Sequence, residues 1–203
     1  MPQPKFIVLD GPEGCGKSTQ GQLLLAHLKT TGQDAILVRD PGTTPISEQI
    51  RALLLNPANG EMNMRCEMLL YMAARAQMMA QIILPALASG QTVICDRFVS
   101  STLAYQLGGD GLTADEIRKT ASIAIRDRWP DLTIILDLPV DKAMSRINRQ
   151  KDRIEQRSHD YHQQVRKNYL AQVAADPKHY RVIAADRPPD VVHADIWKEI
   201  SNL

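Results

Sequence analysis

The fold of this 203-residue chain is decided by one stretch near its start, Phe6-Ile-Val-Leu-Asp10-Gly11-Pro-Glu-Gly-Cys-Gly16-Lys17-Ser18-Thr19. Residues 6–10 form a short apolar run that predicts a buried strand, and a helical pattern starts near residue 17. Between them, residues 11–18 match G-x-x-x-x-G-K-[ST], the pattern of a P-loop. Its glycines allow the backbone angles that turn successive N–H groups onto phosphates, and the helix N-terminus adds its dipole. The stretch therefore predicts a bound nucleoside triphosphate and leaves the second substrate open.

Four more apolar runs continue the alternation of strand and helix along the chain. They are continuously apolar, as expected for a parallel sheet that is covered by helices on both faces. The runs are Ala35–Arg39, Thr92–Asp96, Leu132–Asp137 and Tyr180–Ala184. Helical patterns lie at about 17–31, 45–55, 64–88, 113–127, 139–149, 158–175 and 189–201. We predict one α/β domain over residues 1–203, with a P-loop NTPase fold, a five-stranded parallel sheet and a short lid at about 146–157.

The overall charge and composition exclude several classes of partner. The net charge is only +1, so no global field favours nucleic acid or an anionic membrane. No signal peptide is recognisable, and no apolar run approaches the roughly 18 residues of a membrane span. The three cysteines, Cys15, Cys66 and Cys95, show no C-x-x-C spacing. We therefore predict a cytoplasmic protein in a reducing compartment, with small-molecule substrates, no nucleic acid and no membrane.

Within the P-loop, the residue types predict the contacts with ATP. Lys17 is expected to reach the β- and γ-phosphates, and the Ser18 hydroxyl to ligate Mg²⁺. Asp96 ends the third strand, at the edge of the sheet where ligands bind, and is expected to hold Mg²⁺ beside Ser18, directly or through water. The predicted ATP contacts of the loop are Gly11, Pro12, Glu13, Gly14, Cys15, Gly16, Lys17, Ser18 and Thr19.

The class of P-loop protein is narrowed by what the chain lacks. It has no N-K-x-D base reader of the kind found in GTPases, and it is short for a motor or transporter ATPase. Protein kinases use a different glycine-rich loop. A small chain with this loop and many arginines is typical of a kinase that phosphorylates a metabolite.

Several motifs together make the chain resemble the thymidylate kinase family from about Phe6 to the last predicted helix. They are Glu13 inside the loop, Arg39-Asp-Pro-Gly42, Glu67-Met-Leu-Leu-Tyr71-Met-Ala-Ala-Arg75, Asp96-Arg-Phe-Val-Ser-Ser-Thr-Leu-Ala-Tyr-Gln106, Pro130-Asp-Leu-Thr133 and Asp152-Arg-Ile-Glu155. The resemblance implies transfer of the γ-phosphoryl group of ATP to thymidine monophosphate (dTMP), giving dTDP and ADP in the synthesis of dTTP. It also implies Mg²⁺ as cofactor and a homodimer.

The phosphate and sugar of the acceptor have their own candidate residues. Glu13 is unexpected beside phosphates, because its carboxylate repels them unless it turns toward a sugar hydroxyl; the resemblance assigns it the deoxyribose 3′-OH. The resemblance assigns Arg97 to the acceptor phosphate, and a planar guanidinium is suited to that task. An ion pair between Arg97 and the neighbouring Asp96 is the alternative. Asp40 and Arg51 resemble family residues at the phosphate end, although the family usually has glutamate at the first position and N-capping is an alternative for Asp40.

The base has a second set of candidates. Tyr71 and Arg75 are four residues apart, so they share one helix face. The resemblance implies that Tyr71, a phenylalanine in the family, stacks on thymine and that Arg75 donates to the thymine 4-carbonyl; a core aromatic beside a surface arginine is the alternative. Gln106 resembles the residue that reads the thymine edge, and Tyr105 would crowd the sugar 2′ position. The remaining predicted dTMP contacts are Ser101 and Thr102. Helix capping and core packing are the alternatives for the residues after Arg97.

The segment at 146–157 is the predicted source of a catalytic arginine. The P-loop contains none, and the charge that develops on the transferred phosphoryl group needs one from elsewhere. Arg146, Arg149 and Arg153 form a basic stretch that predicts a mobile lid, with a solvated helix face as the alternative. The resemblance makes Arg153 the predicted catalytic arginine and places Arg149 against the adenine or the phosphates of ATP.

The predicted mechanism needs no general base, because a phosphate monoester is already an anionic nucleophile. It depends on in-line positioning and on charge neutralisation by Lys17, Mg²⁺, Arg97 and Arg153. One alternative is a deoxynucleoside kinase that phosphorylates a hydroxyl with Asp40 as its base. The number of candidate phosphate-binding arginines argues against it. A nucleotide-binding regulatory protein without catalysis is a second alternative, which the complete set of charged residues disfavours.

Overall fold

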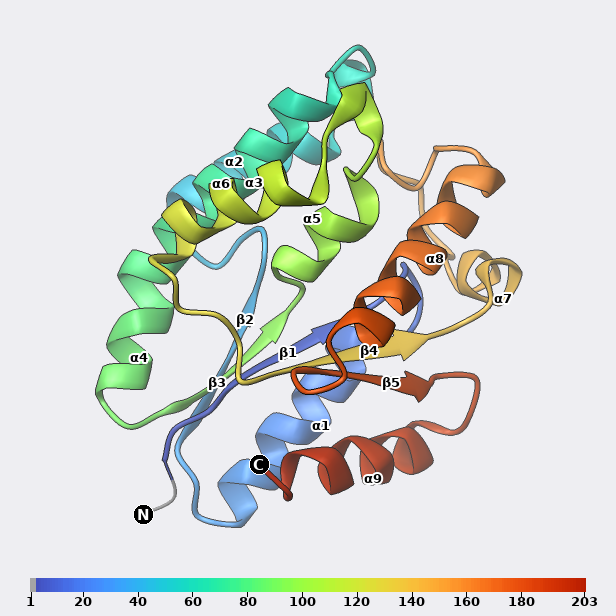
Figure 1. Ribbon diagram of the computed structural model, residues 1–203. Helices are drawn as coiled ribbons and strands as arrows, with labels where there is room; N and C mark the ends of the chain where they lie inside the picture. Colours follow the sequence, from blue (N-terminus) through green and yellow to red (C-terminus); the bar gives the residue numbers. More distant parts are fainter. Residues whose placement is uncertain (1–2) are drawn as a thin grey trace.

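The computed structural model describes residues 3–203, and its centre is one sheet of five parallel strands (Figure 1). In chain order they are β1 (Phe6–Asp10), β2 (Ala35–Arg39), β3 (Thr92–Asp96), β4 (Leu132–Asp137) and β5 (Tyr180–Ala184). The spatial order is β2-β3-β1-β4-β5. The predicted parallel sheet and the bounds of all five strands are confirmed.

Burial along the strands explains why their sequences are continuously apolar. Every residue of β1 and β3 is buried, because both strands lie inside the sheet and both of their faces are covered. On β1, Phe6 and Val8 enter one core cluster, whereas Ile7 and Leu9 enter another on the opposite face. This alternation follows from the two-residue period of a strand.

Helices cover both faces of the sheet, as predicted. The face of Ile7 packs against α1 (Lys17–Thr30) and α9 (Pro189–Ile200). The face of Phe6 packs against the other main helices, which lie above the sheet in Figure 1. They are α2 (Pro45–Leu55), α3 (Met64–Met78), α4 (Leu84–Ala88), α5 (Val99–Tyr105), α6 (Ala114–Ile125) and α8 (His159–Ala175). No described helix has the length and apolar character needed to cross a membrane.

Three helical predictions differ from the structure in detail. The predicted helix at 64–88 is interrupted by a π-helical turn at Met79–Ile83. The predicted ranges did not delimit α5. The predicted helix at 139–149 is the short α7 (Val140–Ser145), because residues 146–151 are exposed except for the half-buried Ile147 and bury no apolar face that would stabilise a helix.

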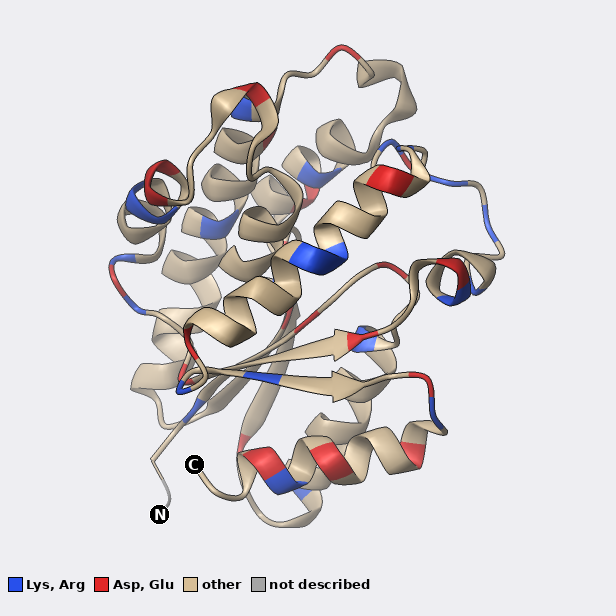
Figure 2. Cartoon of the chain, turned by 45° about the vertical axis from the view of Figure 1, so that its right-hand side comes forward, with Lys and Arg blue, Asp and Glu red and all other residues tan. Residues whose placement is uncertain are grey.

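The parallel arrangement brings the carboxyl ends of all strands to one edge of the sheet. Asp10 ends β1 and Asp96 ends β3, and these two strands are neighbours in the sheet. The loops after them therefore meet at the same edge, where ligands bind in sheets of this kind. The segment between α7 and α8 passes over this edge and carries several cationic residues, as the blue parts of the chain in Figure 2 show.

Candidate active site

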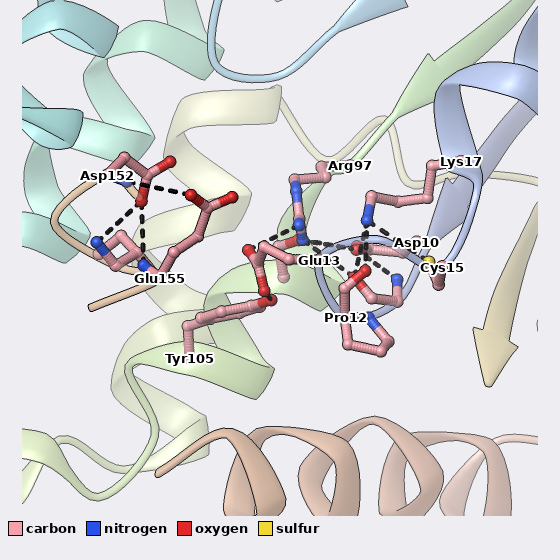
Figure 3. Close-up of polar contacts among 12 residues, drawn as sticks. Asp10, Pro12, Glu13, Cys15, Lys17, Arg97, Tyr105, Asp152 and Glu155 are labelled. Carbon is pink, nitrogen blue, oxygen red and sulfur yellow. Dashed lines mark hydrogen bonds and ion pairs between the residues drawn. The ribbon is translucent and has the colours of Figure 1, made fainter. Parts of the chain in front are cut away.

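The P-loop connects β1 to α1, and its glycines have the conformations that the pattern requires. Gly11, Gly14 and Gly16 have φ angles of 137°, 70° and 97°, in the region where a side chain is strained. A Cβ atom on Gly11 would also lie 2.5 Å from the carbonyl oxygen of Leu136. The Lys17 ammonium donates to the carbonyl oxygens of Gly11 at 3.0 Å and Pro12 at 2.7 Å (Figure 3). The Lys17 ammonium therefore lies inside the turn of the P-loop.

Ser18 and Asp96 form the polar pair that the sequence predicts for a metal site. The Ser18 hydroxyl donates to Asp96 Oδ2 over 2.7 Å. Arg97 does not form the alternative strand-end ion pair with Asp96 in the described structure, because its φ of 71° turns it toward other partners. A hydroxyl beside a carboxylate is an oxygen donor set, which is the kind that Mg²⁺ prefers.

Glu13 turns away from the P-loop and joins Arg97 and Tyr105 (Figure 3). Arg97 Nη2 lies 2.8 Å from Glu13 Oε1, and the Tyr105 hydroxyl donates to Glu13 Oε2. Burial opposes the ionisation of Glu13, but Arg97 and Lys17 outweigh it, so the pKa of this carboxyl lies below its ordinary value. Burial and the Glu13 charge raise the pKa of Tyr105, which keeps its phenol protonated as a donor. The carboxylate is therefore a charged acceptor at the wall of a cavity.

Asp10 connects Arg97 with buried residues of the core. It was not identified as a site residue from the sequence. Its carboxylate is fully buried and accepts hydrogen bonds from Ser100 at 2.5 Å, Ser101 at 2.7 Å and Tyr169 at 2.7 Å. Arg97 Nη1 lies 3.6 Å from the same carboxylate. An acidic residue at the end of an apolar strand is a signal that could have found Asp10. No sequence signal connects it with Tyr169, which is 159 residues away.

A first cavity, here called the acceptor cavity, brings together every residue predicted to contact dTMP. It lies between the P-loop, α2, α3 and α5, beside the P-loop residue Glu13. Its walls are formed by Glu13, Asp40, Arg51, Tyr71, Arg75, Arg97, Ser101, Thr102, Tyr105 and Gln106, with Arg149 and Glu155 at the lid side. These residues come from five separate parts of the sequence, so the fold assembles them.

A second cavity, here called the P-loop cavity, adjoins the first and shares with it Glu13, Arg51, Arg97, Arg149 and Glu155. Its volume is about 530 Å³. Lys17, Ser18 and Asp96 line it together with a group of arginines: Arg39, Arg51, Arg97, Arg146 and Arg149. A chain whose net charge is only +1 thus brings five arginines and Lys17 to one cavity, where they can neutralise phosphates.

Asp40 and Arg75 form a buried ion pair, which corrects two alternatives considered from the sequence. Arg75 Nε lies 2.6 Å from Asp40 Oδ2, and both side chains are 1% exposed. Arg75 is therefore not a surface residue; it also donates to the carbonyl oxygen of Phe98 at 3.1 Å. Asp40 is not an N-cap, because Thr44 caps α2. Burial raises the pKa of Asp40 in spite of the arginine beside it.

Arg51 and Tyr71 form fewer hydrogen bonds than Arg75, and both line the acceptor cavity. Arg51 Nη1 donates to the carbonyl oxygen of Pro41 at 3.1 Å. Burial and the charge of Arg39 lower the pKa of Arg51. Tyr71 is half-buried, and burial together with Glu67 raises the pKa of its phenol, so the ring is neutral. No described residue forms a hydrogen bond with its hydroxyl.

Arg153 lies elsewhere than its predicted catalytic role requires. It is 7% exposed and lines neither cavity. Its Nε donates to the carbonyl oxygen of Leu54 at 2.8 Å, and its Nη2 donates to Glu67 at 2.5 Å. The prediction that Arg153 contacts the phosphates does not agree with this position, because a buried carboxylate on α3 already holds its guanidinium.

Arg149 and Arg146 are the arginines of the lid segment that lie beside the P-loop. Both line the P-loop cavity, and Arg146 Nη1 donates to the carbonyl oxygen of Gly14 at 3.4 Å. Arg149 is paired with Glu155 through two hydrogen bonds of 2.8 and 2.6 Å. Its side chain is nevertheless 62% exposed. The lid segment thus presents Arg149, which was predicted to lie against the adenine or the phosphates of ATP, to the P-loop cavity, and it does not present Arg153 there.

Known proteins similar to this chain share one description. A family model described as thymidylate kinase matches residues 9–196. A curated thymidylate kinase from Ectopseudomonas mendocina is 45% identical over 200 residues, which is 98% of this chain and 95% of that protein. One from Pelotomaculum thermopropionicum is 44% identical over 202 residues, 98% of this chain and 94% of that protein. The crystal structure of thymidylate kinase from Ehrlichia chaffeensis matches with a TM-score of 0.81 at 28% identity, over 98% of this chain and 100% of that one.

Proposed function

The chain belongs to the thymidylate kinase family, and from this premise we propose how its residues divide the work of the reaction. The enzyme transfers the γ-phosphoryl group of ATP to dTMP, giving dTDP and ADP. One observation carries the proposal: a cavity that contains all ten predicted dTMP contacts adjoins a cavity that contains the P-loop lysine. Two substrates in these cavities bring the acceptor phosphate and the γ-phosphate together.

In the acceptor cavity, the base lies at the end formed by Tyr71, Arg75 and Gln106. The half-buried Tyr71 ring is the surface on which thymine stacks. Glu13, charged and turned from the P-loop, accepts a hydrogen bond from the sugar 3′-OH. The phosphate lies toward Arg97 and Arg51, which line both cavities. This direction places the nucleophilic oxygen on the side of Lys17.

The phosphoryl transfer depends on charge neutralisation. Lys17 and the arginines of the P-loop cavity offset the charge of the triphosphate. Ser18 and Asp96 are the residues that would hold Mg²⁺, which supplies a Lewis acid to the phosphates when it is bound. The acceptor oxygen is already anionic, so no residue has to remove a proton.

We assign Arg149 to the role that the sequence suggested for Arg153. Arg149 lines both cavities, and the described partners of its exposed guanidinium, Gln150 and Glu155, both belong to the lid segment. A guanidinium at this place reaches charge that develops between donor and acceptor phosphates. Arg153 and Arg157, which bond to Glu67, anchor the base of the lid segment to α3.

A homodimer is part of the proposal, and exposed apolar residues on three adjacent helices support it. Leu53 on α2, Leu69 on α3 and Ile123 on α6 are exposed. The helix α3 packs against both α2 and α6, and Figure 1 shows the three helices side by side. Light scattering on the purified chain tests this part, because a monomer mass at assay concentrations contradicts it.

The three free cysteines are consistent with a reducing cytosol as the location.

The alternative deoxynucleoside kinase is not favoured. It needs a free carboxylate base, but Asp40 is paired with Arg75 at 2.6 Å. A coupled assay of ADP release with ATP and Mg²⁺ tests the proposal across dTMP, dUMP, dCMP, dGMP, AMP and thymidine. We expect the highest kcat/KM with dTMP. A preference for thymidine would establish the alternative, and no ADP release with any acceptor would contradict both.

A further inference from the structure

The fully buried carboxylate of Glu67 is shared by the lid segment and the base end of the acceptor cavity. Its Oε2 accepts hydrogen bonds from Arg153 Nη2 at 2.5 Å and Arg157 Nη2 at 2.8 Å. Its Oε1 accepts a hydrogen bond from Gln106 Nε2 at 2.7 Å. The two oxygens therefore have separate tasks: one faces two cations, and the other faces a neutral amide.

The bond to Glu67 determines which end of the Gln106 amide faces the cavity. A carboxylate only accepts, so the NH₂ group of Gln106 must point to Glu67. No described residue donates to Gln106 Oε1, although the side chain is only 1% exposed and lines the cavity. Gln106 thus presents its carbonyl oxygen to the cavity, and this oxygen can accept a hydrogen bond but cannot donate one.

We propose that Glu67 is a positioning residue that fixes the amide of Gln106 and thereby selects a base with a donor at N3. This proposal rests on the proposed placement of dTMP in the acceptor cavity. Thymine and uracil carry N3–H, which donates to a carbonyl oxygen. The N3 of cytosine is an acceptor, so it would face the Gln106 oxygen without a proton between them, and such a buried mismatch is costly.

Arg153 and Arg157 determine the orientation that an amide at position 67 would take. They hold Glu67 Oε2, so an amide in place of the carboxylate turns its carbonyl oxygen toward them and its NH₂ toward Gln106. Two NH₂ groups cannot bond to each other. Gln106 must then reverse its amide, and the cavity receives a donor in place of an acceptor. The substitution Glu67→Gln therefore changes the chemistry of base recognition without touching the base.

A comparison of dUMP with dCMP as acceptors measures this reversal. Uracil and cytosine both lack the methyl group of thymine, and they differ at N3, the atom that Gln106 faces. For Glu67→Gln, we expect the ratio of kcat/KM for dUMP over dCMP to fall at least about tenfold from the wild-type value. The ratio for dTMP over dUMP should stay within about twofold, because both carry N3–H. Equal falls in both ratios, or no change in the first, would overturn the proposal.

Three further variants keep the test decisive. Glu67→Asp keeps the charge for both arginines but withdraws the carboxylate from Gln106, so the dUMP/dCMP ratio should also fall even where Glu67→Gln folds poorly. Glu199→Gln makes the same change at a glutamate paired with Arg181 at 2.9 Å, outside both cavities, and should leave the ratios unchanged. In a Gln106→Leu background, Glu67→Gln should have no further effect on the ratio. Additive effects would contradict the positioning role.

The outcome also separates this inference from the proposed function. A wild-type chain that fails to phosphorylate dTMP contradicts the proposed function itself. A wild-type chain that phosphorylates dTMP, with a dUMP/dCMP ratio that is unchanged in Glu67→Gln and Glu67→Asp, contradicts only the role of Glu67.

Discussion

The acceptor cavity and the lid segment hold their arginines in opposite ways. Arg75 is 1% exposed and bonds to an acid, a carbonyl oxygen and Thr102. Arg149 is 62% exposed, and it is held by Glu155, six residues further along the same segment. Buried, fully bonded donors are preorganised, whereas a mostly exposed guanidinium is held weakly, although its partner Glu155 is itself buried. In the proposed site, recognition of dTMP is therefore the task of buried residues, and the lid segment keeps an arginine that can exchange one anionic partner for another at low cost in free energy.

The largest expected loss of activity comes from removing Lys17, the cation that the P-loop itself supplies. In Lys17→Met, the side chain keeps its length but loses its charge, so the triphosphate loses a donor that no neighbouring lysine replaces. We expect kcat to fall by about 10³-fold or more in the coupled assay. Lys167→Met on the exposed side of α8 is the control and should keep the wild-type rate. A loss of less than tenfold in Lys17→Met would contradict its role.

The next effect compares two arginines of the lid segment. Arg149→Ala should lower kcat by about 10²–10³-fold with a smaller loss of stability than Arg153→Ala, because its guanidinium is exposed and Glu155 keeps the backbone N–H of Asp152 as a partner. Arg153→Ala should do the reverse: it removes a buried partner of Glu67, costs about 3 kcal/mol of unfolding free energy and changes kcat by less than about tenfold. Urea unfolding and the coupled assay measure both. The opposite pattern would restore Arg153 as the catalytic arginine.

This pair of arginines also shows where prediction from the sequence stops. The P-loop, the five strands and the ten acceptor-cavity residues follow from local patterns and from motifs read in order. The choice between Arg149 and Arg153 does not, because it depends on Glu67, which lies 86 residues before Arg153. Glu67 is the first residue of the motif that also contains Tyr71 and Arg75, but nothing in the local sequence shows that this acid is fully buried. Contacts between distant segments decide such cases.

A third prediction tests the acceptor side of the comparison. Arg97→Ala removes a guanidinium that is paired with Glu13 and lines both cavities. A charge-assisted hydrogen bond is worth about 1.5–3 kcal/mol, so we expect the KM for dTMP to rise by about 10–100-fold. The KM for ATP should change by less than about threefold. Initial rates at varied dTMP and varied ATP measure both constants. A rise confined to ATP would assign Arg97 to the donor nucleotide.

The smallest expected effect concerns the pair that holds the lid arginine. Glu155 is almost fully buried, and besides Arg149 it accepts the backbone N–H of Asp152 at 3.0 Å. Glu155→Gln keeps an acceptor for that N–H but removes the charge that competes with the phosphates for Arg149. Because the Arg149 guanidinium is mostly exposed and screened by water, the KM for ATP should fall by only about two- to fivefold, at unchanged dTMP affinity. Steady-state rates at saturating dTMP measure this, with Arg149→Ala as the background in which the effect should vanish. A rise in the KM for ATP would mean that Glu155 positions Arg149 for the phosphates and does not compete with them.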